Sequence, residues 1–177
     1  MLPFDRVQVS NKGFLTMFDD VSGFGAWHRR WVVLEGNTLA FWKYPENEKV
    51  KGKTLSFPCE IISHSSFLEP IGRIDLGACV TDTVSIAPRE ICSRMNTFML
   101  ETSRTARQDD KESLVIQRKG HITILRHLLS ADSREERLVW CDILNKALDN
   151  LRAWDTTSRS DHSVSGLCEI NIQKDLF

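Results

Sequence analysis

Residues 13–44, GFLTMFDDVSGFGAWHRRWVVLEGNTLAFWKY, contain the pattern that decides the fold. Up to Phe18 the segment alternates small, aromatic and aliphatic side chains, which predicts a strand. Asp19–Trp27 carries two acids, a serine and two glycines, a composition typical of a loop. Beyond it, a short turn containing Gly36 and Asn37 joins two β-rich segments, which predicts a hairpin of Trp31–Leu34 and Thr38–Tyr44.

Short β-rich segments also follow residue 70, each bounded by polar or turn residues. The predicted strands are Ile71–Leu76, Thr83–Ile86, Thr97–Thr102, Leu114–Gln117 and Ile122–Leu125. Between the third and fourth of these, Ser103–Lys111 is rich in charge and predicts a loop. Trp31, Trp42 and Trp140 are large apolar residues that we expect at core-facing positions.

The last predicted element is an amphipathic helix. Asp132 is its expected N-cap, with Glu135 at the capping-box spacing three residues later. Apolar residues then recur at helical spacing on one face: Trp140, Leu144, Ala147, Leu148 and Leu151. Arg152 lies in the final turn, where a cation is favoured, and the polar segment 155–177 predicts a flexible tail.

This order of elements predicts a mainly β fold: about seven short strands in two packed antiparallel sheets or a barrel, capped by one C-terminal helix. The folded domain is expected over residues 12–154, after an N-terminal extension of residues 1–11. A chain of 177 residues with 41% hydrophobic and 27% charged residues fits one globular domain with loops and tails.

The composition excludes several classes of function. The formal net charge of −1 gives no overall basicity, so a nucleic-acid partner is not expected. No run of about 18 apolar residues predicts a membrane span, and the start lacks the pattern of a secretory signal. We therefore expect a cytosolic protein.

Metal and catalytic sites are not indicated either. The cysteines stand at wide spacings without a CxxC pair: Cys59, Cys79, Cys92, Cys141 and Cys168. His121 and His127 have no carboxylate or cysteine at a useful spacing, and no nucleophile, base and orienting group come together in the pattern. We expect no cofactor and no enzymatic activity.

Several strings resemble a known family. Gly13-x-Leu15, the strand Arg30–Leu34 and the single Trp140 of the helix are similar to the corresponding parts of pleckstrin-homology (PH) domains. Longer blocks resemble the PH domain that closes animal anillins, and together they cover about Lys12–Trp154. These blocks are GFLTMFDDVSGFGAWHRRWVVLEGNTLAFWKYPENEK, PIGRIDL, RMNTFMLET and LLSADSREERLVWCDILNKALDNLRAW.

The resemblance implies a seven-stranded barrel capped by a helix, and a role in the cell. It implies docking on phosphoinositide membranes, chiefly those with phosphatidylinositol 4,5-bisphosphate, and recruitment of septins to the cell cortex and cleavage furrow. The actin-, myosin- and Rho-binding segments of the family lie upstream of its PH domain and are not carried over.

The phosphate site of PH domains can be placed on this sequence. The family's two basic residues on strand two correspond to His28 and Arg30, which strand alternation places on one face. The family's lysine on strand one corresponds to Met17, a departure that predicts modest affinity, since histidine is mostly neutral at pH 7. Further candidate lipid-binding residues are Arg29, Lys12, Lys43, Lys49 and Arg73.

Each of these interpretations has an alternative. Arg29 and Arg30 could be solvated charges beside a core tryptophan. Phe24, between two glycines, is a candidate for insertion into the membrane interface, or else it folds back onto the barrel.

Residues 52–68 interrupt the family match, because PENEKVK would otherwise run almost directly into EPIGRIDL. Codons for Gly52-Lys53 and Leu68-Glu69 can be written as a splice donor and acceptor in one phase. We therefore expect a disordered insert that is a retained intron or a gene-model artefact, and the alternative is a long loop.

Three classes of function follow. The leading hypothesis is a lipid- and septin-binding module of the cell cortex. The second is a protein-interaction domain with negligible lipid affinity, which binds a peptide, a septin or a small GTPase. The third is an enzyme, which the pattern does not support.

Overall fold

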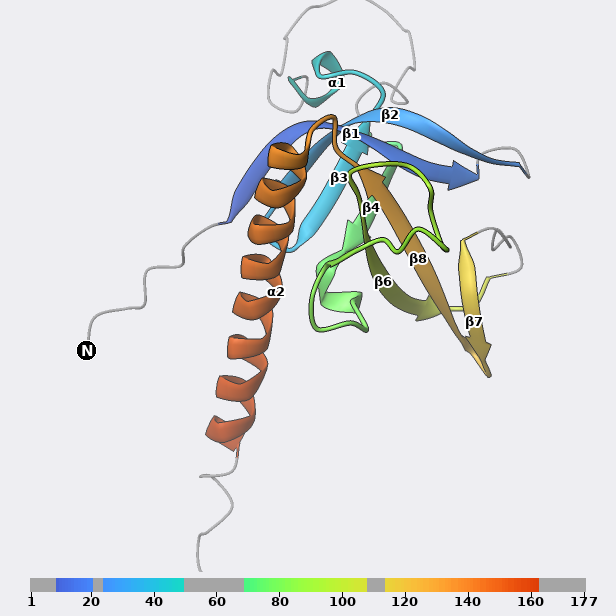
Figure 1. Cartoon of the computed structure of the whole chain (residues 1–177). Coiled ribbons are helices and arrows are strands. Elements are labelled where there is room, and N and C mark those ends of the chain that lie inside the picture. Colours follow the sequence, from blue (N-terminus) through green and yellow to red (C-terminus); the bar gives the residue numbers. More distant parts are fainter. Residues whose placement is uncertain (1–8, 21–23, 50–68, 108–113, 163–177) are drawn as a thin grey trace, which may run out of the picture.

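The computed structural model describes residues 9–20, 24–49, 69–107 and 114–162, and Figure 1 shows their arrangement. In chain order the elements are β1 (Ser10–Asp20), β2 (Gly25–Glu35), β3 (Thr38–Trp42), α1 (Glu46–Lys49), β4 (Gly72–Asp75), a 3-10 turn (Leu76–Ala78), β5 (Ser85–Ile86), β6 (Thr97–Thr105), β7 (Val115–Lys119), β8 (Ile122–Ser130) and α2 (Arg134–His162). The insert predicted at 52–68 lies outside the described residues.

The strands form an antiparallel sheet in the order β4-β3-β2-β1-β8-β6-β5, with β7 beside β8. One half of the sheet contains β1 to β4 and the other β5 to β8. The halves join where β1 pairs with β8, at Thr16↔Ser130 and Met17↔Leu129. The predicted mainly β fold with a C-terminal helix is confirmed. The described residues form eight strands, one for each of the eight β-rich segments of the sequence, although the expected fold had about seven.

The β1–β2 hairpin is longer than predicted. Its strands pair from Ser10↔Glu35 to Asp20↔Gly25, so the prediction of a loop over Asp19–Trp27 is wrong for most of that segment. Acids and glycines favour loops, but cross-strand aromatic contacts stabilise the extended pairing. Phe18 packs edge-on against Trp27 with ring centroids 5.5 Å apart. Pairing with β8 likewise extends β6 to Thr105, into the predicted charged loop.

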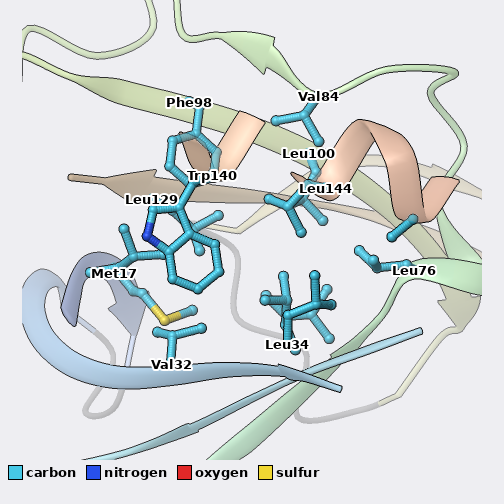
Figure 2. Close-up of a cluster of buried hydrophobic side chains, with 14 of the residues drawn as sticks. Met17, Val32, Leu34, Leu76, Val84, Phe98, Leu100, Leu129, Trp140 and Leu144 are labelled. Atoms are coloured by element: carbon cyan, nitrogen blue, oxygen red, sulfur yellow. The ribbon is translucent and has the colours of Figure 1, made fainter. Parts of the chain in front are cut away.

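The core lies between the two halves of the sheet and α2. Figure 2 shows Trp140 and Leu144 of the helix among Met17, Val32, Leu34 and other side chains from the strands. The predicted apolar face of the helix is confirmed, because Trp140, Leu144, Ala147 and Leu148 are all buried. α2 then extends past the strands (Figure 1) to His162, inside the predicted tail. Extension of a formed helix needs only one further hydrogen bond per residue.

Trp140 and Trp42 are buried as predicted and Trp31 is only half-buried, but Trp42 lies outside the main core cluster. Trp31 and Trp42 pair directly across β2 and β3, on the face opposite Val32 and Leu34. Trp42 is buried there at 5% exposure. Trp31 packs edge-on against Phe14 and donates its Nε1–H to Glu48 Oε2 at 2.6 Å. An indole N–H needs a polar partner when it is covered, and α1 supplies that partner on the outer face.

The helix begins one residue later than predicted. The N-cap is Ser133, whose Oγ accepts a hydrogen bond from the backbone N–H of Glu136 at 3.1 Å. The carboxylate of Glu136 in turn accepts from the N–H of Asp132 at 3.2 Å. The prediction of Asp132 as the cap is therefore wrong. The side chain of Asp132 is held instead by an arginine of β2.

No helix among the described residues is long and apolar enough to cross a membrane.

Candidate functional site: the β1–β2 hairpin

Alternation along β2 divides its basic residues between two faces. Arg30 follows Val32 and Leu34 on the inner face, toward the tip of the hairpin, and is only 9% exposed. His28 has the same parity and lies one step nearer the tip. Arg29 points to the outer face. The predicted pairing of His28 and Arg30 on one face is therefore what the strand geometry produces.

Arg30 has no anionic partner among the described residues. Its Nε is buried without a hydrogen bond, and none of the described salt bridges involves it. The Nε–H of Arg30 is therefore withdrawn from water without a compensating partner among the described residues, and this loss of hydration costs free energy. This arrangement favours binding of an external anion at Arg30.

Two further candidates lie close to Arg30 in the sheet. His28 stands opposite Met17, which is 6% exposed and packs in the core. Met17 is therefore a core residue and contributes no charge to the site. Lys43 directly follows Trp42, the last residue of β3 and the partner of Trp31. Its Nζ lies 5.3 Å from the ring centroid of Tyr44.

Arg29 is engaged on the outer face. Its two terminal nitrogens donate to the two carboxylate oxygens of Asp132 at 2.7 and 2.6 Å. Its guanidinium also lies over the ring of Phe14, 4.7 Å from the centroid. The hydrogen bonds from Arg29 lower the pKa of the Asp132 carboxyl, and the charge of Arg94 adds to this effect.

The remaining candidates lie away from this group. Lys12 and Arg73 share a row across the outer face of β1 to β4, through the pairs Lys12↔Val33↔Ala40↔Arg73. Lys12 is paired with Glu48 at 3.6 Å and Arg73 with Glu69 at 3.2 Å. Lys49 ends α1, and its side chain lies outside the described residues. The structure thus puts His28 and Arg30 on one face of β2, while Lys43 follows the end of the neighbouring strand and the other candidates lie elsewhere.

Phe24 stands at the tip of the hairpin with 82% of its surface exposed. It does not fold back onto the barrel, so that alternative is wrong. The tip presents an apolar ring to solvent between the inner face with Arg30 and the outer face with Arg29.

A hollow of about 590 Å³ opens beside the end of the hairpin stem. It lies between the paired end of β1 and β2, the segment before β6, and the β7–β8 pair. Its lining is Phe18, Trp27, Glu90, Ile91, Cys92, Ser93, Arg94, Ile116, Arg126 and Leu128. The guanidinium of Arg94 lies over the ring of Trp27, 5.2 Å from the centroid. Arg126 is paired with Glu101 at 2.8 Å. The hollow therefore combines apolar walls with a cation at its edge.

Comparison with known proteins agrees with this fold. The family model of the PH domain matches residues 9–149. The chain belongs to the PH-domain family. The anillin of Drosophila melanogaster is 52% identical over 151 residues, which is 85% of this chain and 11% of that protein. The anillin of Homo sapiens is 45% identical over 146 residues, covering 82% of this chain and 12% of that protein.

The predicted anillin-type PH domain is thereby confirmed. A more distant relative, anillin-like protein 1 of Caenorhabditis elegans, is 26% identical over 151 residues, or 85% of this chain and 11% of that protein. The chain spans about a tenth of the length of these curated relatives.

Solved PH domains superpose on the chain with lower similarity. The PH domain of ArhGAP27 has 21% sequence identity and a TM-score of 0.45, covering 78% of this chain and 98% of that one. A solution structure of a pleckstrin homology domain has 20% identity and a TM-score of 0.48, covering 81% and 88%.

Among the described residues, Cys79, Cys92 and Cys141 are free thiols, and no cluster of histidines, cysteines and acids has the geometry of a metal site. Burial raises the pKa of the Cys79 thiol to about 11 and also raises that of Cys141. Both thiols are therefore protonated at neutral pH.

Proposed function

We propose that this PH domain is a non-catalytic module that docks on phosphoinositide membranes, with Arg30 as its main phosphate-binding residue. The observation that carries the proposal is the burial of Arg30 without a counter-ion. An arginine presents several N–H donors in a planar fork that suits phosphate oxygens. His28 adds a donor on the same face of β2, and Lys43 follows the end of the neighbouring strand β3.

The finer assignments rest on the anillin resemblance. It supports phosphatidylinositol 4,5-bisphosphate as the lipid, septins as partners, and a peripheral place at the plasma membrane, cell cortex and cleavage furrow during cytokinesis. The whole relatives are much longer than this chain, so these assignments concern what their PH region contributes to the actomyosin contractile ring.

Vesicle binding by Arg30→Ala tests the lipid site. Vesicles of phosphatidylcholine with and without phosphatidylinositol 4,5-bisphosphate are titrated with the wild type and the variant. Loss of one hydrogen-bonded cation weakens binding by roughly tenfold or more. Lys146→Ala is the matched control, because it removes an exposed cation from α2. Equal binding of the wild type and Arg30→Ala, or binding indifferent to the phosphoinositide, would reject the proposal.

The hollow beside Trp27 favours a second candidate, a protein-docking surface. Ile91, Met95 and Ile116 are exposed on or next to it, and apolar residues gathered at a concave surface are typical of protein contacts. A septin complex is the partner to test, by pull-down with Ile116→Asp. Val80→Asp is the control, because Val80 is also apolar and exposed but does not line the hollow. It lies close in sequence to Asp82, which is paired with Arg152 late in α2. Loss of capture with both variants, or with neither, would reject this surface.

A further inference from the structure

Asp132 and Arg29 connect the start of α2 to the middle of β2. The carboxylate uses both of its oxygens on the two terminal nitrogens of Arg29, at 2.7 and 2.6 Å. The two residues are 103 positions apart in the chain, so the contact exists only in the folded domain. Bidentate pairs of this kind have a defined geometry as well as charge complementarity.

The pair occupies one N–H of each terminal nitrogen of Arg29. On one side the guanidinium faces the ring of Phe14, and on the other it faces Asp132. The side chains are nevertheless 51% and 47% exposed. An exposed ion pair adds little to stability, so another anion that reaches Arg29 competes with Asp132 on nearly equal terms.

We propose that Asp132 sets the affinity of this domain for anionic membranes, by occupying the donors that Arg29 would otherwise offer to a lipid phosphate. The inference rests on the proposed function. Arg29 is adjacent to Arg30 and lies on the opposite face of the same strand, in the hairpin that carries the exposed Phe24 beyond its last pair, Asp20↔Gly25. A membrane that meets this tip therefore comes within reach of both faces.

Asp132 therefore acts as an internal competitor of the membrane. Because its carboxylate and a phosphate satisfy the same N–H groups, each excludes the other from Arg29. Arg94 contributes to the same balance, since its positive charge also favours the ionised Asp132. Removing the carboxylate charge frees Arg29 while leaving the buried Arg30 in place.

The test is vesicle binding by Asp132→Asn, an isosteric change that removes the charge. With vesicles of phosphatidylcholine and phosphatidylinositol 4,5-bisphosphate, the variant is expected to bind roughly fivefold more tightly, the gain typical of one added arginine at an anionic surface. Glu135→Gln is the matched control, because it removes the same charge from the exposed first turn of α2 without a contact to Arg29. In the double variant Arg29→Ala/Asp132→Asn the gain is expected to disappear.

Three outcomes would overturn the inference: no gain with Asp132→Asn, an equal gain with Glu135→Gln, or a gain that persists without Arg29. Thermal unfolding of each variant confirms that it is folded, and Asp132→Ser replaces Asp132→Asn if that variant does not fold. The Arg30→Ala measurement separates the two proposals. If Arg30→Ala loses binding and Asp132→Asn gains none, only the role of Asp132 is wrong, whereas full binding by Arg30→Ala rejects the lipid site itself.

Discussion

Arg30 places a permanent positive charge on the face of β2 that otherwise carries Val32 and Leu34. The resulting loss of hydration is not offset by any partner among the described residues. A binding residue of this kind is expected to lower the stability of the unliganded domain.

Arg30→Met is expected to raise the free energy of unfolding by about 1 kcal/mol while it weakens vesicle binding. The linear methionine side chain fills the same space without a charge. Urea denaturation of the two proteins measures the difference. If Arg30→Met is destabilised by more than the error of the measurement, the charge of Arg30 is satisfied within the folded protein.

His127 makes stability depend on pH. Burial, with a contribution from the charge of Arg104, lowers its pKa from 6.5 to about 4, and its Nε2 lies 2.8 Å from Thr102 Oγ1. The unfolded chain takes up a proton below pH 6.5 that the folded one does not take up until about pH 4. The free energy of unfolding is therefore expected to fall by about 2–3 kcal/mol between these values.

His127→Gln is the control for this prediction, since an amide keeps a polar partner for Thr102 but does not titrate. Urea denaturation at a series of pH values should give the variant a flatter profile between pH 6.5 and 4. The same slope in both proteins would assign the pH dependence to other groups.

At the scale of single elements, the β1–β2 hairpin combines a rigid stem with an exposed tip. Its strands are paired up to Asp20↔Gly25, and beyond them Phe24 contributes an apolar ring with few contacts to the rest of the domain. Phe24→Ser is expected to weaken vesicle binding severalfold without a change in melting temperature, because the side chain is 82% exposed. Val80→Ser is the control, and a large drop in melting temperature with Phe24→Ser would reject a role at the membrane interface.

The start of α2 depends on the hydroxyl of Ser133. Ser133→Ala is expected to lower the free energy of unfolding by about 1 kcal/mol, because the N–H of Glu136 loses its acceptor. Ser133→Asp keeps an acceptor at the cap and should retain most of the stability, as measured by urea denaturation. If Ser133→Ala is as stable as the wild type, the helix is capped by another residue.

The two candidate caps show where prediction from sequence stops. Asp132 and Ser133 are both good caps, and each is followed three residues later by a glutamate, Glu135 or Glu136. Local spacing therefore predicts both equally well. The choice depends on Arg29, which binds Asp132 from a distant strand. The hairpin length was missed for a similar reason, because cross-strand contacts such as Phe18–Trp27 are not visible in the composition of a single segment.

The candidate site, too, could be predicted from the sequence only in part. Strand alternation alone placed His28 and Arg30 on one face, and the structure shows why Met17 differs from a lysine, since it packs in the core. Lys12 is paired with Glu48 and Arg73 with Glu69 in the structure. Nothing in the sequence distinguishes these paired cations from lipid-binding ones. The hollow with Arg94 over Trp27 was missed because three separate segments form it.

At the scale of the whole molecule, α2 and a short seam hold the two halves of the sheet together. β1 and β8 pair at only two positions, while Trp140, Leu144 and Leu148 of α2 belong to one core cluster with side chains from both halves. The helix is therefore part of the single core, and the domain is expected to unfold in one cooperative transition.

Leu144→Ala tests this dependence on the helix. Leu144 is fully buried, so its truncation is expected to lower the free energy of unfolding by about 3 kcal/mol. Circular dichroism of the helix and tryptophan fluorescence should report the same midpoint in urea. Lys146 lies two residues further along α2, and its side chain is exposed. Lys146→Ala should therefore change the free energy of unfolding by less than about 0.5 kcal/mol. Separate transitions for the two probes would mean that the helix detaches on its own.

The buried Arg30 also makes the rate at which the protein is degraded depend on whether the domain is bound to a membrane. A ligand that binds only the folded chain shifts the folding equilibrium in proportion to its occupancy. On the proposed function, a molecule at the membrane has its uncompensated charge neutralised, whereas one in solution does not. The population that opens, and is therefore accessible to proteolysis, is then larger away from the membrane, so that removal of the protein is selective for copies that are not docked.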